Sequence, residues 1–310
     1  MMPVKNNTFN SYIIGETGLA IKCAEVLLEK NHKISGIISQ DKKVEDWAIR
    51  NNIPHYFTIL DADFLLQKIK FDYLFSIANP KIVPAWLLNK PKQLAINYHD
   101  GPLPYYAGTH ATSWAILNNE KMHGVTWHVM TETVDAGDIL KQSKLNLNDT
   151  ETTISLNLKC YERAIEDFYE LIDELNTKTI KRIPQNIKQR TFFYNNKKPL
   201  GGGVIDWTLD AIEIERIFRA MDLGSYPNRF CAPKLIINHA FAYTPSKMSV
   251  VHTNTAGYKL GEIVNLTDSY IDVSSKFGAI RISKVLNELG EEVSLEQVKQ
   301  KHNLAEKQCL

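Results

Sequence analysis

Residues 94–140 read LAINYHDGPLPYYAGTHATSWAILNNEKMHGVTWHVMTETVDAGDIL, and this stretch decides the fold. It begins with LAINYH, a short apolar run that predicts a buried strand ending at His99. Asn97 and His99 are two residues apart, so an extended backbone projects both to the same side, where they can act on one carbonyl. The Gly- and Pro-rich segment that follows predicts a loop at a sheet's carboxyl edge, where open α/β folds bind ligands.

A second polar position follows the next predicted strand, GVTWHVM at 124–130. Asp135 lies in the loop after this strand, 36 residues past His99. The segment VDAGD can turn tightly at Gly137. A carboxylate at this position could orient or charge the His99 imidazole. The sequence therefore predicts a constellation of Asn97, His99 and Asp135.

Strand and helix patterns alternate on either side of this stretch. Further strands are predicted at 11–14, 33–39 and 72–78, and helices at 17–30, 44–51 and 109–119. A longer helix is predicted from a cap at Asp149 or Thr150 to about Leu175. The βαβ alternation indicates an α/β domain with a mostly parallel sheet covered by helices.

The pattern changes at NNKKPLGGGVIDW, residues 195–207, where a basic stretch and three glycines precede another helical pattern. Beyond it lie short hairpin-like segments separated by Gly, Asn, Asp and Ser. We therefore predict a catalytic domain at 1–195, a linker at 196–207 and a small β domain at 208–310, built as an antiparallel barrel or sandwich.

Composition excludes several classes of protein. Hydrophobic residues make up 44% and charged residues 23% of the 310, which is typical of a globular chain. The net charge of +1 gives no overall attraction to nucleic acid or membranes. The cysteines form no C-x-x-C pair, which disfavours a zinc knuckle or a dithiol site. No apolar run approaches the roughly 18 residues of a membrane span. We expect a soluble cytoplasmic protein that binds no metal.

The motifs Asn-x-His, LPYYAG and Asp-x-Gly resemble those of the folate-dependent formyltransferase family. The segment IDW, the helix after it, and the β segments ending in GAIRISKV resemble the C-terminal domain of the methionyl-tRNA branch of this family. The resemblance implies a Rossmann-like catalytic domain followed by a barrel-like, OB-like domain. It also implies that Asn97, His99 and Asp135 catalyse formyl transfer from 10-formyltetrahydrofolate. Asp138 is the less favoured carboxylate, because family members can carry Pro there.

The resemblance also implies where the folate binds. Ile82, Val83 and Leu87 would form an apolar slot for the pterin, and backbone groups near Lys81 would bind its edge. The segment 131–135 would supply further contacts, through Thr131, Glu132, Thr133 and Asp135. His110 and Asp100 are expected to contact the acceptor, although a polar residue at a helix start is an equal alternative for His110. His128, inside an apolar strand, is expected to be structural.

Four acceptors fit this family: methionyl-tRNA, a purine-pathway ribonucleotide, an amino-sugar nucleotide, and an aminoacyl thioester on a peptide-synthetase carrier protein. Residues 204–310 hold 12 Lys/Arg and 13 Asp/Glu, whereas a domain that grips tRNA should be basic. The purine branch is usually one short domain. The residues of the motifs most resemble those of formylation domains of nonribosomal peptide synthetases. A carrier-bound amine is therefore the first expected acceptor, and an amino-sugar nucleotide is the second. The resemblance also implies adjacent synthetase modules in a longer polypeptide. Hydrolysis of formyl-folate, and a catalytically inactive folate-binding scaffold, are the remaining alternatives.

Overall fold

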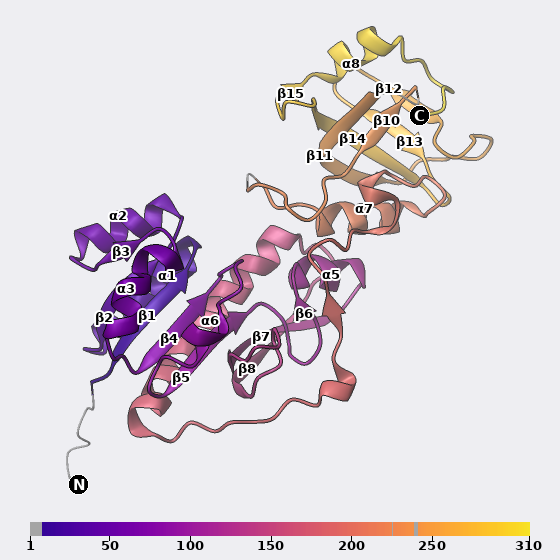
Figure 1. The fold of residues 1–310 in the computed structure, drawn as a ribbon. Coiled ribbons are helices and arrows are strands. Elements are labelled where there is room, and N and C mark those ends of the chain that lie inside the picture. The colour runs from indigo at the N-terminus through magenta and orange to yellow at the C-terminus, as the bar shows by residue number, and fades with distance from the viewer. Residues whose placement is uncertain (1–7, 225, 239–240) are drawn as a thin grey trace. The chain divides into compact units, whose positions relative to one another are not determined.

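A computed structural model describes residues 8–224, 226–238 and 241–310 (Figure 1). They form two units. One contains the described residues up to Ala111, Lys121–Leu147 and Asn157–Tyr194, and the other contains Thr112–Glu120, Asn148–Leu156 and the described residues from Asn195 to Leu310. Two short pieces of the first half of the chain, 112–120 and 148–156, thus belong to the C-terminal unit. The linker expected at 196–207 stays a prediction.

The first unit is built on a seven-stranded sheet in the order β3-β2-β1-β4-β5-β7-β8. Its parallel strands are β1 (Asn10–Gly15), β2 (Lys33–Ile38), β3 (His55–Tyr56), β4 (Tyr73–Ile77) and β5 (Leu94–His99). Two antiparallel strands, β7 (Met122–Val129) and β8 (Ile139–Asn146), complete it. The prediction of a mostly parallel sheet is confirmed. The sequence reading missed β8, because exposed polar residues alternate with its partly buried ones.

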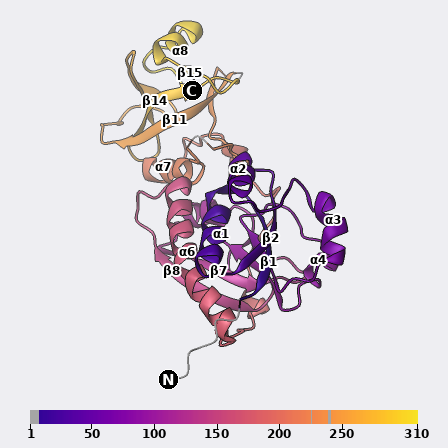
Figure 2. The same cartoon turned by 90° about the vertical axis from the view of Figure 1, so that its left-hand side faces the viewer.

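Helices cover one face of this sheet along much of its width. On that face α1 (Thr17–Glu29) lies beside α6 (Thr153–Thr177), where Tyr169 Oη donates to Glu29 at 2.6 Å (Figure 2). Trp127 points to the same face and donates its Nε1 hydrogen to Ala164 O. The cap expected for α6 at Asp149 or Thr150 is wrong, since Thr152 Oγ1 accepts from Ser155 N where the helix begins.

The opposite face is covered partly by helices and partly by loops. The first unit contains three further helices: α2 (Lys42–Arg50), α3 (Ile59–Lys68) and α4 (Ala85–Leu88). Residues of α3 and α4 pack with Val83 and Ala95 in one apolar cluster. Side chains alternate along a strand, so Asn97 and His99 share this face with Ala95, while Tyr98 packs against Tyr161 of α6 on the other. Asn97 and His99, which follow Ala95 along β5, therefore face loops.

A short parallel pair closes these loops. It joins β6 (Ala107–Gly108) to β9 (Phe192–Phe193), which follows the 3-10 turn η1 (Ile187–Gln189). A helix, α5 (Ala111–Leu117), follows β6. None of the helices in the described part of the chain has the length and hydrophobicity needed to cross a bilayer.

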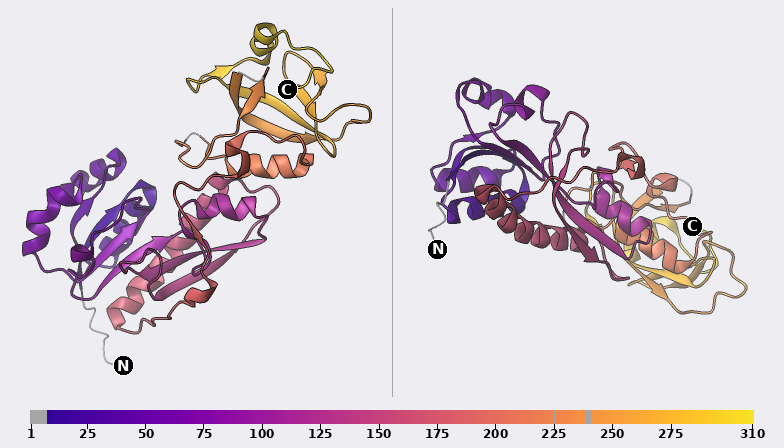
Figure 3. Two further views of the ribbon diagram at one scale, coloured as in Figure 1. Left: turned by 45° about the vertical axis from the view of Figure 1, so that its right-hand side comes forward. Right: turned by 90° about the horizontal axis from the view of Figure 1, so that it is seen from below.

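The second unit is a curled antiparallel sheet, as the barrel-like expectation implied (Figure 3). Its strands are β10 (Leu235–Ile237), β11 (Phe241–Val251), β12 (Ile263–Leu266), β13 (Ile271–Ser274), β14 (Ala279–Leu286) and β15 (Glu292–Val293). It also contains the turn η2 (Leu200–Gly203) and the helices α7 (Ala211–Ala220) and α8 (Leu295–His302). Asp210 caps α7 by accepting from Glu213 N, and a capping box of Ser294 and Gln297 begins α8.

Candidate active site

The site begins where β5 ends, against its antiparallel neighbour β7. Asn97 is paired with His128 and His99 with Thr126 in the register of these strands, so the four side chains share one face of the sheet. His99 is buried and Asn97 is half-buried. The sheet thus fixes the spacing of the two side chains expected to act together.

Asp135 reaches these residues from the loop between β7 and β8. Its Oδ2 lies 3.6 Å from His99 Nδ1 and accepts a hydrogen bond from Gly108 N at 2.8 Å. Its Oδ1 lies 3.4 Å from His128 Nε2. The structure therefore brings Asn97, His99 and Asp135 together, as the spacing predicted, and adds His128.

The Asp135 carboxyl is buried but is held as a carboxylate. Burial alone would raise its pKa. The charge of His99, a hydrogen bond from His128, the charge of His128 and the Gly108 N–H together outweigh burial and hold the pKa of Asp135 well below its usual range. A fixed negative charge thus lies between two imidazoles.

The loop that carries Asp135 is tied down from a distant part of the sequence. Gln185 Nε2 donates to Asp135 O at 3.0 Å and to Gly137 O at 2.6 Å. Arg190 donates to Val134 O. Asp135 itself has a φ of +52°, a left-handed conformation that costs energy for a residue with a side chain. These contacts therefore hold a strained backbone that aims the carboxylate at His99.

The second nitrogen of His99 is also engaged. Nε2 donates to Tyr106 O at 2.8 Å, in the loop between β5 and β6. Thr126 fixes the base of that loop, donating to Gly101 O and accepting from Leu103 N. Acceptors thus face both ring nitrogens of His99, which is the arrangement that a doubly protonated ring needs.

Two family models match the chain. The model described as "Formyl transferase" matches residues 60–171, and "Formyl transferase, C-terminal domain" matches residues 202–303. The chain belongs to the formyl transferase family. The resemblance of its motifs is confirmed, and the chain is a folate-dependent N-formyltransferase with the two-domain architecture of that family.

Curated relatives resemble the chain in sequence, and solved structures resemble it in fold. The methionyl-tRNA formyltransferase of Alkaliphilus oremlandii is 29% identical over 222 residues, covering 66% of this chain and 71% of that protein. That of Clostridioides difficile is 28% identical over 225 residues, covering 67% and 72%. WlaRD, a sugar 3N-formyl transferase solved with dTDP and 5-N-formyl-THF, has a TM-score of 0.70 at 21% identity, covering 91% of this chain and 99% of that chain. An N-formyltransferase from Helicobacter canadensis, complexed with folinic acid and dTDP-3-aminofucose, has a TM-score of 0.68 at 22% identity, covering 90% and 100%.

The other carboxylate of the formyltransferase motif is engaged elsewhere. Asp138 Oδ2 accepts from Arg182 Nε at 2.9 Å and lies 2.9 Å from Arg182 Nη2. This ion pair helps to fasten the strand that follows the loop. Asp135, and not Asp138, is therefore the carboxylate beside His99.

Of the two residues expected to contact the acceptor, Asp100 lies beside His99. Asp100 Oδ1 is 3.9 Å from His99 Nδ1, and the Asp100 carbonyl accepts from His123 Nε2. His110 is half-buried just before α5 and has a φ of +59°. Their roles toward an acceptor stay predictions.

The apolar folate slot expected from Ile82, Val83 and Leu87 is not assembled as one wall. Val83 and Leu87 are buried in the sheet's apolar cluster, where they hold α4 against the sheet. The Ile82 side chain is 75% exposed and, with Lys81, lines a cavity of about 200 Å³ beside Glu16 and Ser39. Thr131, Glu132 and Thr133 are exposed in the loop before Asp135. Ile82, which precedes α4, thus lies at the surface while Val83 and Leu87 are buried, and the role of the three residues toward the pterin stays a prediction.

Sequence reasoning missed several members of the site. His128 was expected to be structural, yet it contacts Asn97 and Asp135. Its alternation with Trp127 is the signal that could have revealed it, because Trp127 faces the core helix. Gln185 and the Gly108 N–H had no readable signal, since one acts across 50 residues and the other is a backbone group.

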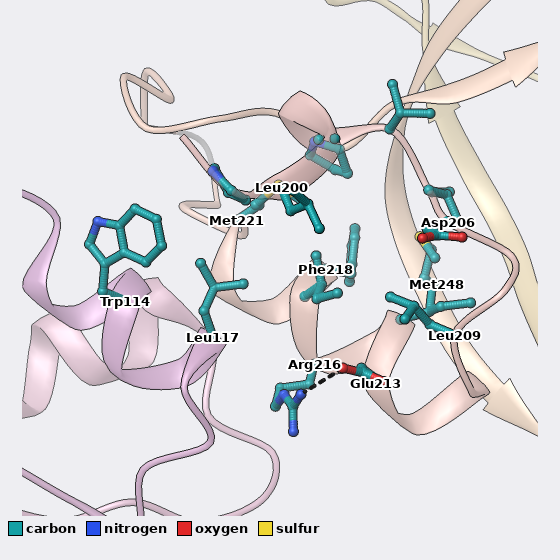
Figure 4. Close-up of a pocket in the computed structure, with 18 residues that line it drawn as sticks. Trp114, Leu117, Leu200, Asp206, Leu209, Glu213, Arg216, Phe218, Met221 and Met248 are labelled. Atoms are coloured by element: carbon teal, nitrogen blue, oxygen red, sulfur yellow. Dashed lines mark hydrogen bonds and ion pairs between the residues drawn. The ribbon is translucent and has the colours of Figure 1, made fainter. Parts of the chain in front are cut away.

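A larger cavity of about 300 Å³ lies inside the second unit (Figure 4). Its walls are mostly apolar and include Trp114, Leu117, Phe218, Met221 and Met248. Asp206, Glu213 and Arg216 are its charged lining residues, and the last two face each other at 3.5 Å. It contains no member of the triad, so formyl chemistry is not assigned to it. In residues 8–224, 226–238 and 241–310, no group of three or more His, Cys, Asp or Glu side chains is arranged to hold a metal ion.

We predict that Gly137→Ala displaces the Asp135 loop. A Cβ at this position would lie 1.9 Å from Val129 O, so the backbone has to move. We expect a loss of about 1–3 kcal/mol of stability together with a large loss of activity, measured by thermal unfolding and turnover. Gly18→Ala in α1 is the matched control, because its Cβ meets nothing within 4 Å. Normal activity of Gly137→Ala would show that the loop position does not matter.

We also predict an acid-dependent contribution of Asp135 to stability. Its folded pKa is depressed, so the stability it contributes is fully present above its unfolded pKa of about 3.9 and is lost as pH falls toward its folded pKa. The difference in unfolding free energy between the wild type and Asp135→Asn should therefore shrink between pH 5 and pH 3. Chemical denaturation at several pH values measures it, and a constant difference would contradict the buried carboxylate.

Proposed function

We propose that this enzyme transfers the formyl group of 10-formyltetrahydrofolate to the primary amine of a sugar nucleotide. The observation that carries the formyl chemistry is the convergence of Asn97, His99 and Asp135 on one face of β5 and its neighbouring loop. An amide, an imidazole and a buried carboxylate supply the donors and the proton acceptor that acyl transfer to an amine requires.

The reaction assigns a task to each residue. The amine nitrogen attacks the formyl carbon, and the π electrons of the carbonyl move to oxygen and form an oxyanion. Asn97 and protonated His99 donate hydrogen bonds to that oxyanion. Collapse breaks the bond from the formyl carbon to the folate nitrogen, and the proton lost by the amine reaches that nitrogen through the His99–Asp135 pair. Substrate has to replace Tyr106 O as the partner of His99 Nε2, a rearrangement common when active sites bind their ligands.

A segment beside the triad supports an acceptor that carries phosphate. Residues 178–190, here called the basic segment, contain five Lys or Arg and no Asp or Glu. Arg182 and Arg190 anchor it to Asp138 and Val134 O. Its lysines, Lys178, Lys181 and Lys188, are exposed. A segment that carries exposed lysines is thus anchored to the loop of Asp135, where a pyrophosphate can be attracted.

The relatives favour the sugar nucleotide over the carrier protein. Methionyl-tRNA and amino-sugar acceptors appear in the names of the relatives given above, and none of those names points to a peptide-synthetase carrier. The expectation of a carrier-bound amine therefore has no support from them. Methionyl-tRNA is the second candidate, because the curated relatives carry that activity in their names. The acidic balance of residues 204–310 weighs against it.

We predict that Asn97→Ala, His99→Ala and Asp135→Ala each reduce transfer by about 10²–10³-fold, because each removes a group acting on the transition state. The assay supplies 10-formyltetrahydrofolate with an amino-sugar nucleotide, methionyl-tRNA and an aminoacyl carrier thioester in parallel, and scores mass gain of one formyl group. Asp138→Asn is the control and should keep most activity. Formylation of the tRNA or carrier alone would overturn the proposed acceptor, and formate release without transfer would indicate a hydrolase.

We further predict that Lys181→Ala combined with Lys188→Ala raises KM for the sugar nucleotide and weakens the dependence of that KM on salt, since phosphate contacts are screened by ions. The double variant Lys43→Ala with Lys70→Ala removes equal charge from exposed positions elsewhere and should change neither. A rise confined to the KM for folate would instead assign the basic segment to the glutamate tail of the donor.

A further inference from the structure

The apolar cavity of the second unit has no task in formyl transfer. It has a volume of about 300 Å³, and its walls include Trp114, Phe218, Met221 and Met248. Small-molecule sites are concavities of roughly 300–1,000 Å³, lined mostly by apolar and aromatic side chains with a few polar groups. The cavity therefore has the size and the walls of a binding site.

The turn η2 forms one edge of this cavity (Figure 4). Leu200, at the start of the turn, lines the cavity and yet has a fully exposed side chain. Gly201 follows it with a φ of +74°, and a Cβ there would meet nothing within 4 Å. This edge is thus open. An apolar molecule in the cavity would cover the Leu200 side chain and remove its surface from water, which is favourable.

One arginine borders the cavity with unused hydrogen-bond donors. Arg216 is the only basic residue among the described residues that line it. Its Nε is buried and has no hydrogen-bond partner in the described part of the chain. Its Nη2 lies 3.5 Å from Glu213 Oε1, whereas a strong charge-assisted hydrogen bond spans about 2.7–2.9 Å (Figure 4). The guanidinium of Arg216 therefore retains donors for an anion.

Another arginine of α7 shows the contrast. Arg219 Nε lies 2.9 and 2.8 Å from the two carboxylate oxygens of Glu215, and its Nη1 donates to Glu151 O at 2.6 Å. Arg216 has no such set of close acceptors. A guanidinium that borders apolar walls loses water without regaining hydrogen bonds, which is costly. The carboxylate of a ligand would supply the missing acceptor.

The two acidic residues at the cavity do not fill this role. Asp206 Oδ1 accepts from Thr208 N at 2.9 Å and from Thr208 Oγ1 at 2.6 Å, so this carboxylate serves its own loop. Glu213 is paired only weakly with Arg216 and competes with any ligand anion for the same donors. Removal of the Glu213 charge should therefore favour an anion in the cavity and disfavour a cation.

We propose that this cavity binds a small molecule with a compact apolar body and one carboxylate. The body contacts Trp114 and Leu117 of α5 and Phe218 and Met221 of α7, and the carboxylate accepts hydrogen bonds from the Arg216 guanidinium. The site lies in the second unit and contains no member of the triad. It is therefore independent of the proposed formyl transfer.

The binding test uses three probes that share one body and differ in charge: 4-phenylbutyrate, 4-phenylbutanol and 4-phenylbutylamine. Isothermal titration calorimetry with the full chain measures their affinities. We expect the acid to bind about 10-fold more tightly than the alcohol, because a hydrogen bond to a charged donor supplies about that factor, and the amine to bind most weakly. Equal affinities, a preference for the amine or alcohol, or no binding of the acid would each overturn the proposal.

Two substitutions test the charge at the cavity. Glu213→Gln should tighten binding of 4-phenylbutyrate about 3-fold, because it removes the competing carboxylate. Arg216→Met keeps the apolar stem and should abolish the preference for the acid over the alcohol. Lys247→Met is the matched control, since it removes an exposed cation elsewhere in the second unit and should change neither affinity. Weaker binding of the acid to Glu213→Gln would contradict the assignment of an anion.

Methionine methyl signals locate the bound probe. Met221 and Met248 line the cavity, whereas Met122 and Met130 lie in the first unit. In ¹³C-methyl spectra, 4-phenylbutyrate should shift the first two signals and leave the other two unchanged. Shifts confined to Met122 or Met130 would place the ligand outside the cavity and refute the site.

A substitution that fills the cavity completes the test. Leu117→Trp should abolish the methyl shifts, and the smaller change Leu117→Phe should weaken binding. Leu289→Trp is the control, because Leu289 is 82% exposed in the connection between β14 and β15. Thermal unfolding checks that each variant is folded. Undiminished binding to a folded Leu117→Trp or Leu117→Phe would overturn the proposal. None of these measurements requires formyl transfer, so their outcome is separate from that of the proposed function.

Discussion

The buried Asp135 carboxylate is the constraint on which the rest of the site depends. An isolated carboxylate removed from water is costly, so its surroundings have to supply compensating charge and hydrogen bonds. Three separate segments do so here: His99 at the end of β5, His128 on β7 and the Gly108 N–H of β6. A change in any of these segments alters the energy of the Asp135 carboxylate. The charge of this one group therefore couples the sheet to two loops.

This dependence explains which parts of the site a sequence can reveal. Asn97 and His99 were found because a strand projects residues two apart to the same side, and Asp135 because its loop follows a recognisable strand. His128 was misjudged because apolar neighbours made it look like a core residue, although Trp127 beside it had to point the other way. Gln185 is 50 residues from the loop that it holds, and periodicity carries no information about such a contact.

The fold shows the same division between local and long-range information. Apolar runs placed β1, β2, β4, β5 and β7 correctly, because a strand in the interior of the sheet is buried on both faces and is therefore mostly apolar. The edge strand β8 was not predicted, since Lys141 and Lys144 interrupt its apolar pattern. The different burial of Ile82 and Leu87 has a related cause. Both are apolar, but Leu87 lies in α4 and packs on the sheet, whereas Ile82 precedes the helix and is exposed.

Charge has to be considered at the same local scale. The balance of residues 204–310 gave no sign of an anionic ligand, whereas the basic segment has five cations and no Asp or Glu of its own. Two of these cations, Arg182 and Arg190, anchor the segment to the loop that carries Asp135. The contacts that hold the loop of Asp135 therefore also hold the segment that carries these lysines. The position of the Asp135 carboxylate and the proposed attraction of a phosphate-bearing acceptor therefore depend on the same short stretch of chain.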